Sequence, residues 1–488
     1  MLYDLPLFMV NDLSSGPYGP EVTCKIARIQ KYYETYLEGA DFDVTPDKDY
    51  DPKIWKSKKI KRLIDKQAEF MMGNTPEIKV ACVDAPEGCD NQSNMQAYLN
   101  KVLKKNNFAS KLIRGARDCF IGGRVFLKVN ITPEKITLMF IPADNFLYDT
   151  DPDDVDTLSR VILFYCVKDT DDKEEQRWWR QRYRMYNGKC LVTEELYDGY
   201  GNKISGYGTE ERDTGLSCIP GYVIINEGLS GDTEGESDVE MLRDEDSMYN
   251  ELRSGNSDTL KKNMNPLTYV IGASPKTFDK LSRKPGAIND IQADPVLKGN
   301  LPKVDQIENT FSFNQSYNDT LNCVSQEMFD NLGVPDLRAA ATSGLVTSGK
   351  GLKALYWPLI SRCNGKWSVW GPALEAVATI IVDAAEIFPN LKQTYGDFKK
   401  EEYTITVEPA YSLPEDEDSE RELDLREVGT GRSIKSYIMK WGGPNHTGLS
   451  AEKADEEIKQ MALEKQMMDS AAMGELDGVT DFGGGGDE

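Results

Sequence analysis

The stretch from Ser237 to Asn263, SDVEMLRDEDSMYNELRSGNSDTLKKN, predicts the element around which the rest of the chain is arranged. It can form a helix of about 27 residues, or ~40 Å at 1.5 Å per residue, before Asn265-Pro266 ends it. Because so little of this helix is apolar, we expect it to pack against copies of itself or against neighbouring proteins. Its narrow apolar stripe consists of Met241, Leu242, Met248, Tyr249 and Leu252.

A second long helix is expected from about Gln306 to Leu332, after a compact excursion over residues 267–305 that begins with a strand-like segment and contains four prolines. Apolar residues at helical spacing give this helix a single apolar face. They are Phe313, Tyr317, Leu321, Val324, Met328 and Leu332. Two long, thin helices that bracket a small proline-rich module indicate a stalk with a tip.

The chain before the stalk predicts a few helices followed by an antiparallel, β-rich body. Helices are expected at 50–72, 91–105 and 108–120, and strands at 124–131, 135–141, 159–168, 181–186, 189–197 and 221–225. The helix at 50–72 is basic, which is typical of a solvated face more often than of a DNA or lipid site. The body and the stalk together indicate an α+β fold.

The chain after the stalk is expected to be mostly helical. A long helix fits residues 352–387, with a kink near Gly365 and Gly371-Pro372. A strand at 403–407 and helices at 414–428, 433–441 and 450–467 follow. The glycine-rich, acidic end, ELDGVTDFGGGGDE, predicts disorder.

Composition excludes several classes of protein. The 57 Lys and Arg against 81 Asp and Glu give a net charge of −24, which argues against a conventional DNA-wrapping surface. The N-terminus lacks the basic region of a signal peptide, and the longest apolar run, Val161–Val167, is far short of a membrane span. Nine cysteines without CxxC pairs indicate reduced, buried thiols in a cytoplasmic product.

One motif points towards nucleotide chemistry but is incomplete. Gly344–Lys350, GLVTSGK, fits the first seven positions of a phosphate-binding P-loop, whereas the eighth, Gly351, lacks the hydroxyl that would hold Mg²⁺. The residues before it, PDLRAAA, do not read as a buried strand, and no Walker B strand accompanies it. These departures argue against nucleotide hydrolysis.

Other motifs for catalysis and metal binding are also weak. Asp149, Asp151 and Asp153 begin like a calcium loop, but Asp154 and Arg160 stand where Gly and Glu are needed. The single histidine, at position 446, has no nucleophile motif beside it, and GxSxG and HExxH motifs are lacking. We therefore expect no catalytic residues, no metal and no cofactor.

The segment that fails as a P-loop still has a distinctive composition. Residues 339–351 are almost all small, with Leu345 and Val346 as the apolar exceptions and Lys350 as the one cation. We expect a mobile loop between the stalk and the long helix. If several copies face one axis, their loops form a flexible collar that presents small polar groups and a ring of lysines; the residues concerned are Thr342, Ser343, Thr347, Ser348 and Lys350.

This order of parts resembles the portal, or head–tail connector, proteins of tailed bacteriophages. The stretches that carry the resemblance are RLIDKQAEFMMGNTPEI (62–78), GGRVFLKVN (122–130), IPADNFLYD (141–149), IPGYVIINEG (219–228), SDVEMLRDEDSMYNELRS (237–254), LGVPDL (332–337) and SGKGLK (348–353). They span most of residues 50–360. The proposed clip contains no such stretch, and Gly351 stands where a better helix former is more usual.

The resemblance implies a ring, usually of twelve subunits, whose subunit has a wing, a two-helix stem, a small α/β clip, a long kinked helix and a helical crown. It divides this chain into a wing (1–236), stem helices (237–264 and 309–334) around the clip (265–308), a tunnel loop (335–351), the long helix (352–400), the crown (401–470) and a disordered acidic tail (471–488). Lys261 and Lys262 would face either the channel or solvent, and the apolar face of the second stem helix (Phe313, Tyr317, Leu321, Val324 and Met328) would pack subunits together.

The same resemblance implies a passive conduit for double-stranded DNA at one capsid vertex, assembled in the host cytoplasm and carried in the virion. The partners expected are other copies of the chain, a terminase, head–tail adaptors, and the capsid and scaffolding proteins, but not a membrane. An acidic ring with few cations would hold passing DNA only weakly. Two alternatives remain open: an elongated tail or baseplate protein, and a degenerate P-loop ATPase.

Overall fold

The computed structural model describes residues 6, 9, 19–44, 52–83, 90–170, 172–264, 267–271, 303–307, 313–337, 349–411, 417–428, 431–443 and 448–477. The chain divides into two compact units: Met1–Arg338 with Tyr356–Ser412, and Ala339–Leu355 with Leu413–Glu488. Helices make up 51% and strands 25%, so the fold mixes helix and sheet as expected for an α+β protein.

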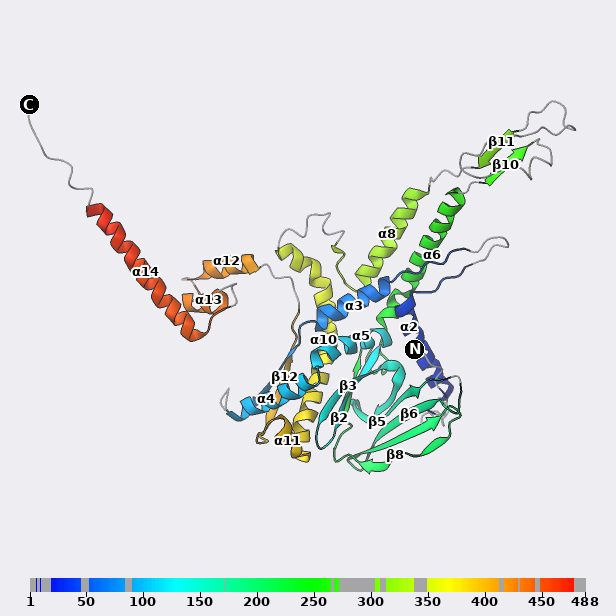
Figure 1. Ribbon diagram of the computed structural model, residues 1–488, viewed down its shortest axis with the longest axis horizontal. Helices are drawn as coiled ribbons and strands as arrows, with labels where there is room; N and C mark the ends of the chain where they lie inside the picture. The colour runs from blue at the N-terminus through cyan, green and yellow to red at the C-terminus, as the bar shows by residue number, and fades with distance from the viewer. Residues whose placement is uncertain are drawn as a thin grey trace, which may run out of the picture. The chain divides into compact units, whose positions relative to one another are not determined.

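Two antiparallel sheets form the β-rich body of the first unit (Figure 1). Five strands occur in the order β4-β5-β6-β7-β8, and three in the order β3-β2-β9. Their bounds are β2 Arg124–Ile131, β3 Ile136–Pro142, β4 Phe146–Asp151, β5 Asp154–Lys168, β6 Arg177–Tyr186, β7 Lys189–Asp198, β8 Lys203–Asp213 and β9 Gly221–Ile225, with the short 3-10 helix η2 Ala143–Asn145 before β4. The predicted strands are confirmed; β4 and β8 were not expected.

The body is held together by an apolar core, and polar pairs on neighbouring strands lie beside it. Phe126 and Phe146 are fully buried, with ring centroids 5.9 Å apart. Arg180 of β6 donates to the carboxylate of Glu195 on β7 at 2.6 and 3.0 Å, and to the hydroxyl of Tyr197. Although burial opposes the shift, hydrogen bonds from Arg180 and Tyr197 lower the pKa of Glu195 to about 2.

Helices and a two-stranded sheet accompany this body in the same unit. They are α2 Gly19–Glu38, α3 Lys59–Met72, α4 Asp90–Lys105, α5 Phe108–Gly122, α10 Gly349–Ile387, which begins in the second unit, and α11 Asn390–Tyr395; β1 Glu77–Cys82 pairs antiparallel with β12 Tyr403–Glu408. The helices at 91–105 and 108–120 and the strand at 403–407 are confirmed. The expected start at residue 50 is wrong for α3, because residues 52–58 are not helical.

The long helix α10 is continuous through Pro358 and Pro372. Trp370 is fully buried within it. Among the described residues, Lys353–Ile387 is long and apolar enough to cross a membrane, and half of its most apolar window is buried inside the protein. This helix was not singled out from the sequence as a possible membrane span, because the longest uninterrupted apolar run lies at residues 161–167.

The two predicted stalk helices are present and pack against each other (Figure 1). They are α6 Asp238–Met264 and α8 Asn314–Asn331. Between them, β10 Leu267–Ile271 pairs antiparallel with β11 Lys303–Ile307. The helix expected from Gln306 therefore begins too early, since residues 306 and 307 belong to a strand. Most of the predicted tip, residues 272–302, lies outside the described residues.

The described part of the second unit contains three helices after residue 412: α12 Glu417–Glu427, α13 Ile434–Trp441 and α14 Ala451–Asp477. Ser433 caps α13, because its hydroxyl accepts the backbone N–H of Ser436 at 3.2 Å. The three predicted helices are confirmed, but α14 extends to Asp477 and so enters the segment expected to be disordered. Residues 478–488 lie outside the described range.

Candidate functional site

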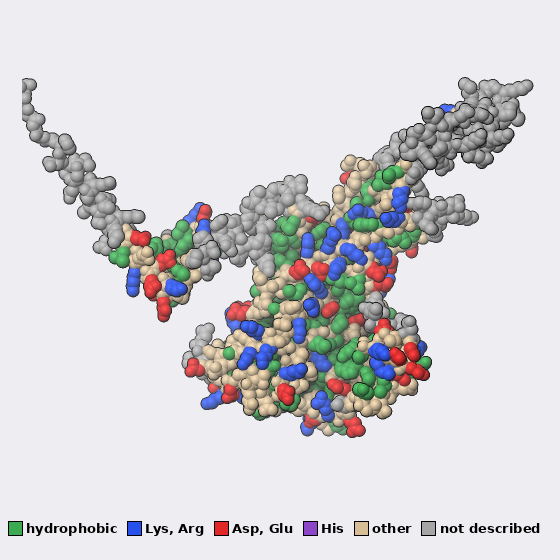
Figure 2. All heavy atoms as spheres, in the orientation of Figure 1, with side chains coloured by type: hydrophobic (Ala, Val, Ile, Leu, Met, Phe, Trp, Pro, Cys, Tyr) green, Lys and Arg blue, Asp and Glu red, His purple; other side chains and the backbone are tan. Residues whose placement is uncertain are grey.

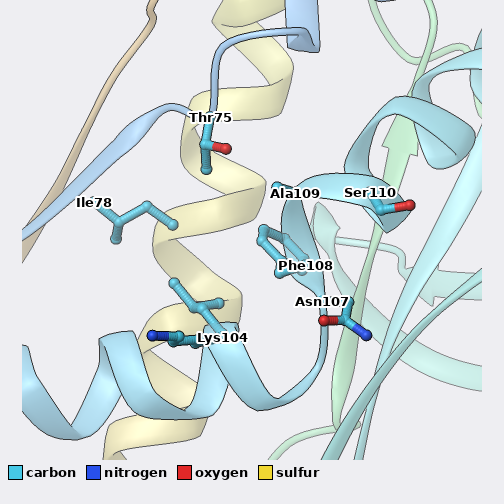
Figure 3. A pocket seen from close by; sticks show the side chains of 8 residues that line it. Thr75, Ile78, Lys104, Asn107, Phe108, Ala109 and Ser110 are labelled. Carbon is cyan, nitrogen blue, oxygen red and sulfur yellow. The ribbon is translucent and has the colours of Figure 1, made fainter.

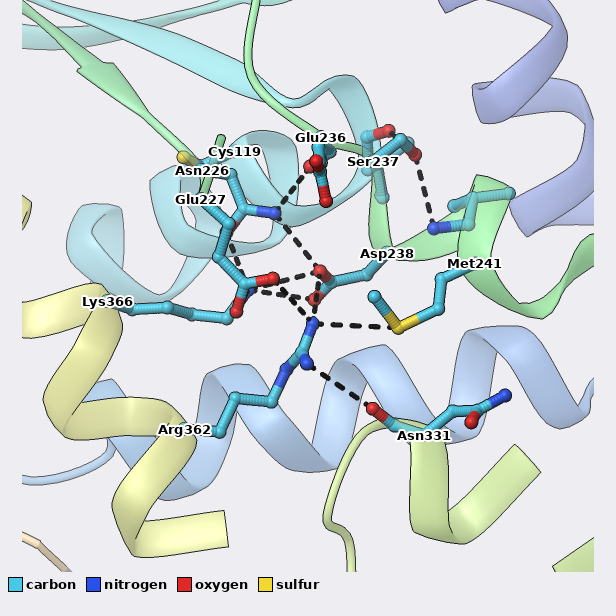
Figure 4. A network of polar contacts seen from close by, with 12 residues as sticks. Cys119, Asn226, Glu227, Glu236, Ser237, Asp238, Met241, Asn331, Arg362 and Lys366 are labelled. Carbon is cyan, nitrogen blue, oxygen red and sulfur yellow. Dashed lines mark hydrogen bonds and ion pairs between the residues drawn. The ribbon is translucent and has the colours of Figure 1, made fainter. Parts of the chain in front are cut away.

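A buried ionic network joins the start of α6 to α10 (Figure 4). The side chains of Asp238, the first residue of α6, and Lys366, on α10, are each 1% exposed. Lys366 Nζ lies 3.0 and 3.1 Å from the two carboxylate oxygens of Asp238, and it donates to Asn226 Oδ1 at 2.5 Å. A charge pair buried this deeply is stable only when further hydrogen bonds surround it.

Arg362 extends the network to two more segments. It lies one helical turn before Lys366, so both cations project from the same face of α10. Its NH2 group lies 3.1 Å from Asp238 Oδ1 and 3.0 Å from Glu227 Oε2, and NH1 donates to the carbonyl of Asn331 at 3.3 Å. The network therefore joins the segment after β9, the first residue of α6, the last residue of α8, and α10.

Local sequence explains why α6 begins at this point. The hydroxyl of Ser237 accepts the backbone N–H of Val239 at 3.1 Å, as an N-cap does, and donates to the carbonyl of Ile121 at 2.6 Å. Asp238 and Glu240 in the first turn are stabilised by the helix dipole. The cap thus fixes both the start of α6 and the position of Asp238.

This network is built for structure rather than for reactivity. Two cations, Arg362 and Lys366, face two carboxylates, Glu227 and Asp238, so the charges balance. Burial raises the pKa of the neighbouring Cys363 thiol to about 12, which makes it a poor nucleophile. Across the described ranges, no group of three or more His, Cys, Asp or Glu side chains is arranged to hold a metal ion.

A second polar arrangement lies along α6 and holds residues 52–58, here called the strap. Asp246, Asn250, Ser254 and Asp258 follow one another at four-residue spacing, and all four are buried. Asn250, Ser254 and Asp258 accept the backbone N–H groups of residues 57, 55 and 53 at 2.7, 2.9 and 3.2 Å. Four residues of helix rise about 6.0 Å and two of extended chain about 6.6 Å, so the two repeats nearly match.

The four polar residues of α6, here called the ladder, also contact the residues that follow α2. The carboxylate of Asp246 accepts the N–H of Ala40 at 2.9 Å and the hydroxyl proton of Ser57, and the amide of Asn250 donates to the carbonyl of Ala40 at 3.1 Å. Sequence reasoning missed this site because it looked for apolar stripes. The signal was a repeat of short polar residues every fourth position, D-x3-N-x3-S-x3-D, in a helix with few apolar side chains.

The predicted site residues are described only in part. Thr342, Ser343, Thr347 and Ser348 lie outside the described residues; Lys350 falls in the first turn of α10 and Lys262 near the end of α6, and neither side chain is described. Lys261 Nζ lies 3.6 Å from Asp258 Oδ1. On the apolar face of α8, Val324 and Met328 are buried and Phe313 is 40% exposed, while Tyr317 and Leu321 are intermediate.

A pocket of about 500 Å³ lies where the end of α4 turns into α5 (Figure 3). Asn107, at this turn, has a left-handed backbone with φ of 49°. Lys104 is the charged residue of the lining, and Ile78 and Phe108 contribute apolar surface. Among the described lining residues, Lys104 is the ionisable one and no carboxylate accompanies it, so the lining does not suggest a reaction.

Comparisons with known proteins identify the family. The family described as "Phage portal protein, SPP1 Gp6-like" matches residues 23–471. No curated protein matches the sequence significantly. Similar solved structures include the neck of an empty gene transfer agent particle (13% identity, TM-score 0.44, covering 77% of this chain and 88% of that one) and the virion of a native gene transfer agent particle (13%, 0.43, 78% and 89%).

The identity and TM-scores of these solved structures are low, so the assignment rests on the family match, which spans nearly the whole chain. The resemblance read from residues 62–353 is thereby confirmed. The chain belongs to the SPP1 Gp6-like family of phage portal proteins, the head–tail connectors of phage particles.

Proposed function

We propose that this chain assembles into a ring at one capsid vertex and forms the conduit through which double-stranded DNA enters and leaves. The observation that carries the proposal is the family match over residues 23–471. The packed α6–α8 pair, with the antiparallel β10–β11 pair between the two helices in sequence, supports it as a stem that leads into a clip.

In this proposal the β-rich body and its helices (1–236) are the wing, and α6 and α8 are the stem. Residues 265–308 are the clip, where a terminase docks during packaging and head–tail adaptors dock afterwards. Residues 335–351 are the tunnel loop, and the helices α12, α13 and α14 belong to the crown. Twelve subunits are the expected number, and capsid and scaffolding proteins are the expected neighbours in the shell.

The buried network links the proposed stem to the helix that follows the proposed tunnel loop. Arg362 and Lys366 lie on α10, the helix that follows the proposed tunnel loop, and they clamp the first residue of α6. A displacement of α10 at this level must therefore either move the root of the stem or break a buried ion pair. In this proposal, α10 and the stem are therefore coupled through Asp238.

The negative net charge of the chain suits a channel through which DNA passes without being retained. Duplex DNA carries one negative charge per ~1.7 Å of axis, so a strongly basic channel would retain it. The net charge of −24 per subunit keeps the ring as a whole from binding DNA in that way. Lys350 of each tunnel loop, with Thr342, Ser343, Thr347 and Ser348, would supply limited contacts.

The decisive experiment is the mass and shape of the purified full-length protein. Light scattering and negative-stain imaging should give a closed ring with a central hole slightly wider than duplex DNA. Lys350→Ala should then lower DNA packaging in a complementation assay while leaving the ring intact. Assemblies without an axial hole would instead favour an elongated tail or baseplate component.

The ATPase alternative is disfavoured by the fold. A P-loop follows a strand of a parallel sheet, whereas all the strand ladders within the described chain are antiparallel. Nucleotide binding that disappears in Lys350→Ala would support the ATPase and overturn the portal assignment.

A further inference from the structure

A cleft of about 620 Å³ lies among α3, α6 and α8. Four cations line it and define what we call the cationic cleft: Lys59, Arg62, Lys66 and Arg253. Asp336 is the one carboxylate in the lining, so the formal charge is 4 − 1 = +3 within a chain of net charge −24. Figure 2 shows a band of Lys and Arg side chains over this part of the molecule.

None of the salt bridges found between described residues includes the four cations of the cleft, whereas Lys56 and Lys61 on the same segment are each paired with an aspartate. Lys59 Nζ lies 3.7 Å from the ring centroid of Tyr249, and burial lowers the pKa of this lysine to about 8. The cleft thus concentrates positive charge that the described part of the subunit does not neutralise with a salt bridge.

The same subunit carries the opposite charge on another side of α8. The helix contains no Lys or Arg, and Asp319, Glu327 and Asp330 are exposed and absent from the salt bridges between described residues. At 3.6 residues per turn these positions share one face, here called the acidic face of α8. Residues 321, 325 and 329, which line the cleft, lie roughly on the opposite side of the helix.

The cationic cleft and the acidic face of α8 have opposite charges, and their charged residues extend over similar lengths. Lys59, Arg62 and Lys66 follow one another at i, i+3 and i+7 on one face of α3, a length of about 10 Å, and Asp319 and Glu327 are about 12 Å apart along α8. The acidic face carries a formal charge of −3 against +3 in the cleft. A contact between two different faces of one subunit is head-to-tail, and such a contact forms a ring when the rotation between neighbouring subunits closes on itself.

We propose that the cationic cleft receives the acidic face of α8 from a second copy of this chain, so that each subunit in the ring presents both halves of the contact. This inference rests on the proposed function, because it needs a ring. Leu63, Leu321 and Phe329 supply apolar surface around the cations, which favours a protein helix over a fully hydrated polyanion.

The test reverses charge on each face of the full-length chain. Arg62→Glu with Lys66→Glu places like charges at every contact, and Asp319→Lys with Glu327→Lys does the same from the other side. All four positions are exposed, so the fold should persist, and circular dichroism checks this. Each pair should raise the concentration needed for ring formation by about tenfold or more, since like charges across an interface are strongly unfavourable.

The combination of all four substitutions in one chain restores opposite charges and should restore the ring. The matched control is Lys101→Glu with Lys104→Glu, two exposed lysines of α4, which should leave assembly unchanged. Ring mass is followed by light scattering and sedimentation across a salt series.

Three results overturn the inference. Rings that persist in both reversed pairs, or folded four-fold variants that stay monomeric, would show that the two faces do not meet. Loss of double-stranded DNA binding in Arg62→Glu with Lys66→Glu, with rings intact, would assign the cleft to phosphate instead. A wild-type chain that forms no ring would refute the proposed function itself, which is a distinct outcome.

Discussion

Removing the Asp238 carboxylate is expected to destabilise the junction between α6 and α10 by about 3–5 kcal/mol, the usual cost of breaking a buried ion pair. Asp238→Ala leaves Lys366, which is 1% exposed, with Glu227 at 3.9 Å as its remaining salt-bridge partner, and Arg362 with that same carboxylate. Two cations then share one carboxylate in a site from which water is largely excluded.

Lys366→Met should cost less, because Arg362 still lies 3.1 Å from Asp238 Oδ1 and neutralises it. The pair Asp238→Ala with Lys366→Met removes both buried charges and should recover part of the loss, as expected when a buried ion pair is replaced as a unit. Thermal unfolding and hydrogen exchange at the start of α6 would measure the four corners of this double-mutant cycle.

The control is Lys168→Met, which removes an ion pair to Glu175 whose partners are 51% and 60% exposed and should leave the unfolding midpoint unchanged. If Asp238→Ala and Lys168→Met have equal effects, or if the cycle shows no coupling, the reasoning is refuted. The two charges would then act independently, and the proposed mechanical link through Asp238 would fail with them.

Three further outcomes are expected. Burial, followed by repulsion from Asp144, raises the pKa of Asp118 to about 7, so the folded state holds a proton that the unfolded state loses near pH 4. The free energy of unfolding should therefore fall as pH rises from about 4 to 7. Asp118→Asn should flatten that slope in urea titrations. Asn250→Ala should cost about 2 kcal/mol and speed exchange of the strap amide at position 57, and unchanged protection there would contradict the ladder. Gly333 has φ of 64°, and an added Cβ would lie 3.0 Å from the backbone of Pro358, so Gly333→Ala should lower the melting temperature; an unchanged value would show that the turn adapts.

The element pattern was predictable where periodicity is strong. The helices α4, α5 and α6 and the strands β2, β3 and β7 follow their apolar spacing closely, so their bounds differ little from those expected. The strand β8, KISGYGTEERD, was missed because it is polar and rich in glycine, and it is stabilised by pairing with β7 rather than by its own side chains.

The site was less accessible from sequence because its contacts are long-range. Lys366 and Asp238 are 128 positions apart, and neither residue type stands out in a chain with 28% charged residues. The basic segment 50–72 was read as one helix, yet the backbone before Lys59 hydrogen-bonds to side chains of α6 instead of to itself. The periodicity of apolar residues does not show whether a backbone segment hydrogen-bonds within a helix or to side chains of another element.

The strap and α6 have slightly different repeats. Their hydrogen-bonding groups therefore stay opposite each other only over a short length. The extended chain advances about 0.6 Å more per rung than the helix does. The three backbone bonds lengthen in order, 2.7, 2.9 and 3.2 Å from residue 57 to residue 53, which is the direction that such a mismatch predicts. A strap of this kind therefore limits its own length to a few rungs and sets its own register. A shift of the strap by one residue would turn its N–H groups away from α6. A shift by two residues would start the hydrogen-bonded series where the two repeats are already out of step.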